Sequence, residues 1–511
     1  MKSKTANMLF LISLVGVLFG VVVVQNVIDK HTDLIFLYNR MVQFDTCLKD
    51  GNIPYFYYND FNRLGYGSSF FYGQLLFWVL RPFAWEFRSF VTIYLALSIT
   101  LVFYGSSYLA RRYTRNNRLI AYIYTFSSMW CSAYLLGGMY PLYMAHGLSL
   151  LFIGCCVDFF RDNKPFIPAG VLFFVILNTH TLSALIAFSL CVLVFIKYFK
   201  WKRVSSYCQF AVYCIILCSY TLANGFYHRD ALSSIEGTTL GMLEYYKRVQ
   251  SVFYLNPYIL KPLGGEAGFH LIDVITFLLC LYACKPSKKV YRSLIVIVLG
   301  CLLMCPPGWY YFIKATKLPL QFPIRIAGWF VLLFFLTTLR GKLKKKVVIF
   351  LAAMPLLLSI LFGFKVIPGD KLEGHPYPLM QVMNGEYLSE EFKYGYPWYE
   401  VVELPNSHDF ILDADKTYAF ISGKKRVLFP KLYYKGYKAF HNGKELPVTR
   451  GYSQLCQVDT TGVSGLVTLV YVHPIWLKAL GFICYTIFLM SLLIIVSDYF
   501  IRRIFSGFEE V

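Results

Sequence analysis

The chain has 511 residues, of which 57% are hydrophobic and 15% are charged, and its mean hydropathy is +0.53. A soluble domain carries about 25% charged residues, so this composition excludes a soluble globular protein and indicates a polytopic membrane protein. The net charge of +21 would also fit a nucleic-acid-binding protein, but just under half of the 49 Lys and Arg lie in short patches beside apolar segments. That distribution follows the positive-inside rule rather than forming a polyanion-binding surface.

Placing every basic patch in the cytoplasm determines how the apolar runs cross the membrane. We predict a mainly α fold of about 12 transmembrane helices in the plasma membrane, with both termini cytoplasmic and a large first outer loop at 28–89. The first apolar run is too long for a signal-peptide core, so we expect it to be retained. The predicted spans are 7–27, 90–110, 119–137, 143–160, two short helices between Lys164 and Lys197, 205–223, 269–284, 291–305, 325–340, 347–365 and 475–497.

The apolar run between Lys164 and Lys197 is too long for one helix and has a polar centre, Asn178 to Thr181. We therefore predict two short helices that meet at this point. Because broken helices at membrane depth are tolerated only inside protein, we expect the pair to be buried in protein rather than in lipid.

The composition changes after the transmembrane domain, which we assign to residues 1–365. Residues 366–474 contain prolines, polar residues and alternating patterns, among them Asn442-Gly443 between two short strands and an alternating run at 464–472. An Asn-Gly pair is a strong hairpin signal. We predict an extracytoplasmic β-rich domain, followed at 475–511 by the last transmembrane helix and a cytoplasmic tail.

A helix beginning near Asp33 opens the first outer loop. Its apolar residues form one stripe, whereas Asp33 and Arg40 lie on a neighbouring face that we expect to face water. Asp33, just beyond the first span, is the candidate general base for an acceptor hydroxyl, although a first-turn acid that only stabilises the helix is the simpler alternative. The predicted stripe is Leu34, Leu37, Met41, Phe44 and Leu48.

Three further residues could hold an anionic phosphate: Arg40, His180 and Arg325. An ionisable residue within the membrane is a functional candidate by default, and arginine binds phosphate well. The alternatives are that His180 only satisfies backbone groups at the helix break and that Arg325 only extends to the interface.

His31, Tyr66 and Tyr72 could line a substrate site, because Gly65-Tyr66-Gly67 and Phe70 to Gly73 place aromatic rings beside tight turns. The alternative is a re-entrant segment without a ligand. His270 and Asp273 could pair with each other for structure or for a proton path, and we expect His146 to be structural. Cys47 and Cys456 are the two cysteines expected outside, where a disulfide between them is an open alternative.

Several motifs resemble bacterial membrane proteins of the YfhO type and relatives labelled "6-pyruvoyl-tetrahydropterin synthase-related", a label that need not imply pterin chemistry. The similar motifs are His31-Thr32-Asp33 with Arg40, Lys49 to Pro54, Gly65 to Gly67, Phe71 to Gly73, Asn178 to Ala184, Gln321 to Arg325, Tyr433 to Glu445 and Val472 to Pro474. This chain has Ile324 and Tyr437 where those families commonly have tryptophan.

These families resemble glycosyltransferases of the GT-C clan, which transfer sugars from polyprenyl-phosphate carriers on the outer face of the membrane. The resemblance implies a cell-envelope glycan or teichoic-acid-like acceptor and a catalytic base at Asp33. A divalent metal is compatible with this reading but not required by it, and the sequence contains no Cys/His metal spacing.

Two other functions stay open. A transporter or flippase of lipid-linked glycans would show internal repeats and paired charges at mid-membrane, and the sequence shows no such repeat. A non-catalytic membrane protein that binds envelope glycans through its outer domain would not need Asp33.

Overall fold

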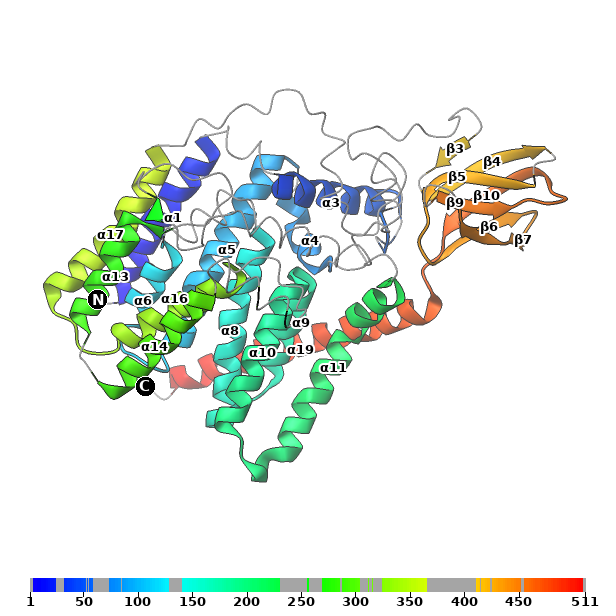
Figure 1. Cartoon of the computed structure of the whole chain (residues 1–511). Coiled ribbons are helices and arrows are strands. Elements are labelled where there is room, and N and C mark those ends of the chain that lie inside the picture. The colour runs from blue at the N-terminus through cyan, green and yellow to red at the C-terminus, as the bar shows by residue number, and fades with distance from the viewer. Residues whose placement is uncertain are drawn as a thin grey trace.

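The computed structural model describes residues 3–23, 32–51, 53, 55–57, 73–83, 85–127, 140–229, 255–256, 269–284, 287–303, 311, 315, 324–364, 410–413, 415–422, 425–451 and 455–508. The protein is mainly helical, with a β region near the C-terminus. Figure 1 shows the β strands gathered at one side of a helical bundle, and the long last helix running from the β domain back across the bundle.

The described helices of the bundle follow the order of the predicted apolar runs. They are α1 (Ser3–Val23), α3 (Thr32–Lys49), α4 (Leu75–Leu80), η2 (Arg81–Phe83), α5 (Phe87–Ala110), α6 (Asn117–Thr125), α8 (Tyr140–Asp162), α9 (Ile167–Thr179), α10 (Thr181–Tyr198), η4 (Trp201–Arg203), α11 (Val204–Tyr227), α13 (Leu271–Ala283), α14 (Lys288–Leu303), α16 (Ile324–Thr338), α17 (Lys345–Phe364) and α19 (Ile475–Phe508). Two short strands, β1 (Leu255–Asn256) and β2 (Phe269–His270), pair in parallel before α13.

Among the described residues, five helices are long and apolar enough to cross a membrane. They are Phe87–Ala110, Tyr140–Asp162, Thr181–Tyr198, Trp201–Tyr227 and Ile475–Tyr499. Their length and apolar composition indicate a membrane protein. The full set of twelve spans and the orientation of the termini stay predictions.

α5 and α8 form the tightly packed centre of the bundle, and glycines allow their close approach. A Cβ at Gly147 would lie 2.7 Å from the backbone nitrogen of Val102, and one at Gly105 would lie 2.6 Å from the carbonyl oxygen of Gly147. Farther along, a Cβ at Gly154 would meet the ring of Tyr108. Small residues at such a crossing are typical of helix pairs in membranes, where close backbone packing replaces the hydrophobic effect.

The helix break predicted between Lys164 and Lys197 is confirmed: α9 ends at Thr179 and α10 begins at Thr181. The break itself is buried, because Asn178 is 1% exposed and His180 is 8% exposed. The expectation that both helices are buried in protein is wrong for α10, which exposes Leu193 and Ile196. α10 uses a narrow face of small residues for packing and turns its large apolar residues outward, as a lipid-facing helix does.

The β domain consists of two antiparallel sheets, with strand orders β3-β4-β10-β6-β7 and β5-β9-β8. Its strands are β3 (Phe410–Asp413), β4 (Lys416–Ser422), β5 (Arg426–Leu432), β6 (Tyr437–His441), β7 (Lys444–Leu446), β8 (Val448–Arg450), β9 (Leu455–Asp459) and β10 (Ser464–Tyr471). Buried residues of both sheets, such as Phe429 and Val467, form one apolar core. The sheets therefore pack face to face as a small sandwich.

The predicted hairpin is present between β6 and β7. His441 pairs with Lys444, and the two residues between them, Asn442 and Gly443, both have positive φ, at 49° and 78°. Positive φ at both positions defines the type I′ turn that matches the twist of the flanking strands. The alternating run at the C-terminal end of the domain forms β10, which lies at the centre of the larger sheet.

Candidate functional site

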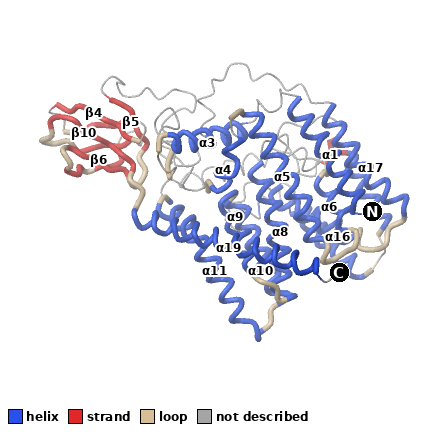
Figure 2. The backbone as a smooth tube through the Cα atoms, turned by 180° about the vertical axis from the view of Figure 1, so that it is seen from behind, coloured by secondary structure: helices blue, strands red, loops and turns tan. Residues whose placement is uncertain are grey.

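α3 lies across the end of the bundle at which α5 begins (Figures 1 and 2). The Tyr38 ring packs against Phe87 and Phe90 of α5, at centroid distances of 5.1 and 5.7 Å. From the predicted apolar stripe, Met41 and Phe44 are fully buried. The amphipathic pattern therefore seats this helix on the bundle.

Arg40 is buried, at 4% exposure, although we expected it to face water. The helix α4 explains the difference, because it covers this side of α3 and brings the Phe77 ring to 5.1 Å from the guanidinium carbon of Arg40. A guanidinium is weakly hydrated and stacks on aromatic rings, so it tolerates such a place better than an ammonium group does. The result is a positive charge in a low-dielectric, aromatic environment.

Gly73, within the predicted first outer loop, lies directly against the helix break. A Cβ at Gly73 would overlap Oδ1 of Asn178 and lie 2.5 Å from its Cα, so only glycine fits. Asn178 is anchored in turn, because its amide donates to the carbonyl of Phe174 at 2.9 Å and its Oδ1 accepts from Thr221 of α11 at 3.2 Å. Gly73 precedes α4 by two residues, so one short segment connects the surroundings of Arg40 with the helix break.

His180 forms the break by leaving the helical conformation, at φ −157° and ψ 105°. Its Nδ1 accepts the backbone N–H of Ser183 at 3.1 Å and lies 2.9 Å from Oγ of the same serine. His180 is thus the N-cap of α10, which agrees with the structural alternative. Because Nδ1 is an acceptor here, the neutral ring carries its proton on Nε2, which is the nitrogen that can donate to an anion.

For the other predicted site residues, the described part of the structure does not include the side chains. Asp33 is in the first turn of α3 and Arg325 is the second residue of α16, but their side chains lie outside the described part of the structure. His31, Tyr66 and Tyr72 also lie outside the described residues, as do the side chains of His270 and Asp273. Their proposed roles stay predictions.

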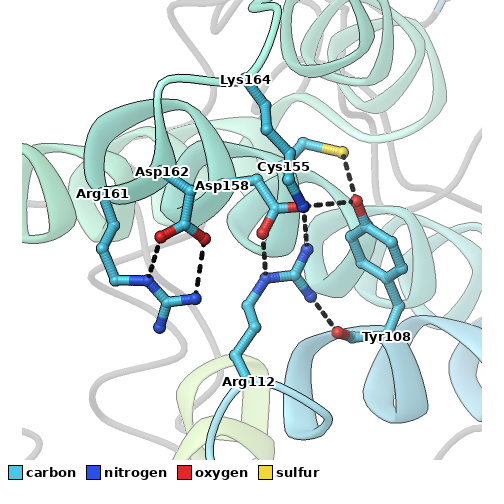
Figure 3. A network of polar contacts seen from close by, with 7 residues as sticks. All are labelled: Tyr108, Arg112, Cys155, Asp158, Arg161, Asp162 and Lys164. Atoms are coloured by element: carbon cyan, nitrogen blue, oxygen red, sulfur yellow. Dashed lines mark hydrogen bonds and ion pairs between the residues drawn. The ribbon is translucent and has the colours of Figure 1, made fainter.

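Asp158 is a buried acid that we did not single out from the sequence (Figure 3). Its Oδ1 accepts from Nε of Arg112 at 2.7 Å, and its Oδ2 accepts from Tyr108 at 3.0 Å and lies 3.2 Å from Nζ of Lys164. The side chains of Arg112 and Asp158 are 3% and 7% exposed. The sequence pattern that could have pointed to Asp158 is an acidic residue inside an apolar span, in a chain region that follows an arginine-rich patch.

His146 is also buried, at 4% exposure, and it joins three helices. Tyr124 of α6 donates to the carbonyl of Gly328 in α16 at 3.0 Å, and its hydroxyl lies 2.6 Å from Nε2 of His146 in α8. Since the hydroxyl proton is directed at Gly328, Nε2 of His146 is the donor to Tyr124. The His146 ring packs edge-on against Trp329, one turn after Arg325. The structural role expected for His146 fits these contacts.

Two histidines lie where the β domain joins the bundle. Nε2 of His228, just after α11, lies 3.1 Å from the hydroxyl of Tyr471 in β10. His473, just before α19, is 3% exposed and stacks on the ring of Tyr55 at a centroid distance of 4.4 Å. Neither ring nitrogen of His473 has a hydrogen-bond partner within the described structure.

Both histidines at this junction are neutral at neutral pH. Burial lowers the pKa of His473 to about 4, and the Lys478 ammonium contributes further. Burial also lowers the pKa of His228 to about 3, with smaller contributions from His473 and Lys435. A buried imidazole without an acidic neighbour keeps its uncharged form.

Over the described residues, no group of three His, Cys, Asp or Glu side chains could hold a metal ion. Cys47 and Cys456 are not joined in a disulfide; the first is partly buried at the end of α3 and the second is buried in the β core.

A helix on the bundle end carries Asp33 in its first turn and a buried Arg40, and Gly73 of the same predicted loop packs against Asn178 at the helix break. No protein-family model, no curated protein and no solved structure matches the chain.

Proposed function

We propose that the protein is a GT-C-like membrane glycosyltransferase that moves a sugar from a polyprenyl-phosphate carrier to a cell-envelope glycan on the outer face. The observation that carries this proposal is the docking of the first outer loop: Arg40 is buried beneath Phe77, and Gly73 packs on the helix break at Asn178. The motif resemblance of the first loop and the tail is the second support.

In this mechanism Asp33 takes the proton of the acceptor hydroxyl as its oxygen attacks the anomeric carbon of the donor sugar. The bond between that carbon and the phosphate oxygen breaks, and polyprenyl phosphate leaves as an anion. Arg40, His180 and Arg325 are the proposed phosphate ligands. A buried guanidinium stabilises such developing charge more strongly than an exposed one, because the low dielectric of its surroundings weakens screening.

The decisive experiment compares Asp33→Asn with Asp45→Asn in proteoliposomes. Asp45 lies on the same helix and pairs with Lys49 and Arg81 at 2.6 and 2.7 Å, so its substitution removes an acid from α3 without removing the proposed base. We offer a panel of polyprenyl-phosphate sugars with envelope extract and measure the release of free polyprenyl phosphate.

We expect release by the wild type and by Asp45→Asn, and a loss of about 10² to 10⁴-fold in Asp33→Asn, the range typical of general-base removal. Full activity of Asp33→Asn would refute the role of Asp33. If no donor is consumed but labelled lipid-linked glycan crosses the bilayer, the protein is a flippase. If glycan only binds, it is a binding protein.

A further inference from the structure

Three consecutive residues of the first outer loop enter three different parts of the molecule. Tyr55 stacks on His473 in the linker between the β domain and α19. Phe56 is 6% exposed and belongs to the apolar core of the β sandwich, whereas Tyr57 is fully buried in the core of the helical bundle. The residues Tyr55–Tyr57, here called the strap, therefore join both domains and their linker.

The contacts of Phe56 are those of a core residue rather than of a surface loop. Its ring lies 4.6 Å from Tyr471, 5.5 Å from Tyr434 and 6.0 Å from Tyr437, measured between centroids. Aromatic rings at these separations interact favourably beyond the area that they bury. The β domain thus completes its core with a side chain supplied from a distant part of the sequence.

The strap is also connected to α3. Cys47, in the last turn of that helix, directs its thiol to the carbonyl oxygen of Phe56 at 3.9 Å. Only five residues separate Lys49, the end of α3, from Tyr55. Five or six residues span at most roughly 20 Å when extended, so a displacement of the strap is passed on to α3 within a short distance.

We propose that the strap couples the β domain to α3, so that the β domain and the helix carrying Asp33 and Arg40 change position together. The partner for the aromatic pocket formed by Tyr434, Tyr437 and Tyr471 is therefore the first outer loop of the same chain. Release of Phe56 from this pocket frees the end of α3 while the sandwich stays folded. This coupling does not depend on the transferase reaction.

Two native cysteines report on the two sides of the strap. Cys47 lies on α3 and Cys456 is fully buried in the β core, so the labelling of Cys456 reports on unfolding of the sandwich. The full-length protein in nanodiscs is treated with a maleimide, and the labelling rate of each cysteine is followed by peptide mass spectrometry. The labelling rate of a protected thiol measures how often its surroundings open.

In Phe56→Ala we expect the labelling of Cys47 to accelerate about tenfold while Cys456 stays protected. Phe56→Leu, which retains most of the apolar contact, should return Cys47 toward the wild-type rate. The matched control is Phe420→Ala, because Phe420 is a phenylalanine of the same domain that is 76% exposed. It should change neither rate.

If Phe56→Ala unfolds the sandwich and exposes Cys456, the variant Tyr55→Ala provides a second test of the coupling. This change removes the stacking on His473 without touching the β core, and it should also accelerate Cys47 labelling while Cys456 stays protected. Unchanged Cys47 labelling in Tyr55→Ala, or in a Phe56→Ala protein whose Cys456 stays protected, would overturn the coupling.

Discussion

The two ends of the α5–α8 pair use buried charge in different ways. At one end the Asp158 carboxylate is matched by Arg112 and Lys164 and accepts a further hydrogen bond from Tyr108 (Figure 3). At the other end Arg40 lies among aromatic rings, beside the docked outer loop. The first arrangement fastens two helices, whereas the second places a buried positive charge beside aromatic rings.

The comparison shows that burial of a charge does not by itself identify a functional site. Asp158 is surrounded by opposite charges and short hydrogen bonds, whereas the guanidinium of Arg40 packs against the Phe77 ring of the helix α4. Hydrogen bonds also extend Asp158's network along its own helix pair, since Arg112 donates to the carbonyl of Tyr108. We therefore expect changes at the first end to act on stability and changes at the second end to act on activity.

The largest effect is expected for Asp158→Asn. It leaves the Arg112 guanidinium buried without its charge partner, which costs roughly 3–5 kcal/mol. The measurement is the temperature at which the purified protein loses its monodisperse elution peak. The control is the double variant Asp158→Leu/Arg112→Met, which replaces both charges by apolar groups and should recover much of the lost stability. A single variant as stable as the wild type would show that this network does not fasten the helices.

Arg40→Met tests the opposite end. Methionine keeps an apolar stem in contact with Phe77, so we expect little change in thermal stability. Loss of a charged hydrogen-bond donor to the phosphate should lower sugar transfer about a hundredfold, equal to roughly 2.7 kcal/mol. Raising the donor concentration should partly restore the rate. If the variant loses stability but keeps its activity, the role of Arg40 is structural, like that of Asp158.

The pH dependence of the domain junction is the smallest of the three effects. His473 has a pKa of about 4 in the folded protein, below the value of about 6.5 expected when unfolded, so the unfolded state binds more protons as the pH falls. The resulting decrease in the free energy of unfolding begins below pH 6.5, grows toward pH 4 and amounts to roughly 2 kcal/mol at pH 5.

His473→Phe should keep the stacking on Tyr55 and reduce the slope of the stability profile between pH 6.5 and pH 5 by about half, because the buried His228 contributes a similar dependence. The profile is measured from thermal unfolding in buffers of equal ionic strength. The groups near His473 include Tyr55, Tyr220, Tyr471, Lys478 and His228, and none of these is an acid that would favour protonation. An unchanged slope in the variant would assign the pH dependence to other groups.

Local features of the structure were largely predictable. The stripe of α3, the helix break at His180 and the type I′ hairpin all follow from patterns that span a few residues, because helix periodicity and turn chemistry are local properties. The starts of α5 and α8 lie within three residues of their predicted positions. The burial of Arg40 was not predictable in this way, because it depends on Phe77 in a different helix.

The class of protein, the order of its helices and the β-rich segment near the C-terminus follow from the amino-acid sequence alone, since apolar length and alternation are properties of the chain. Tertiary structure decided which of the buried polar residues meet. Arg112 and Asp158 are 46 residues apart, and Phe56 enters a core built from residues beyond 410. Such pairings depend on how helices and sheets pack, and no local pattern encodes them.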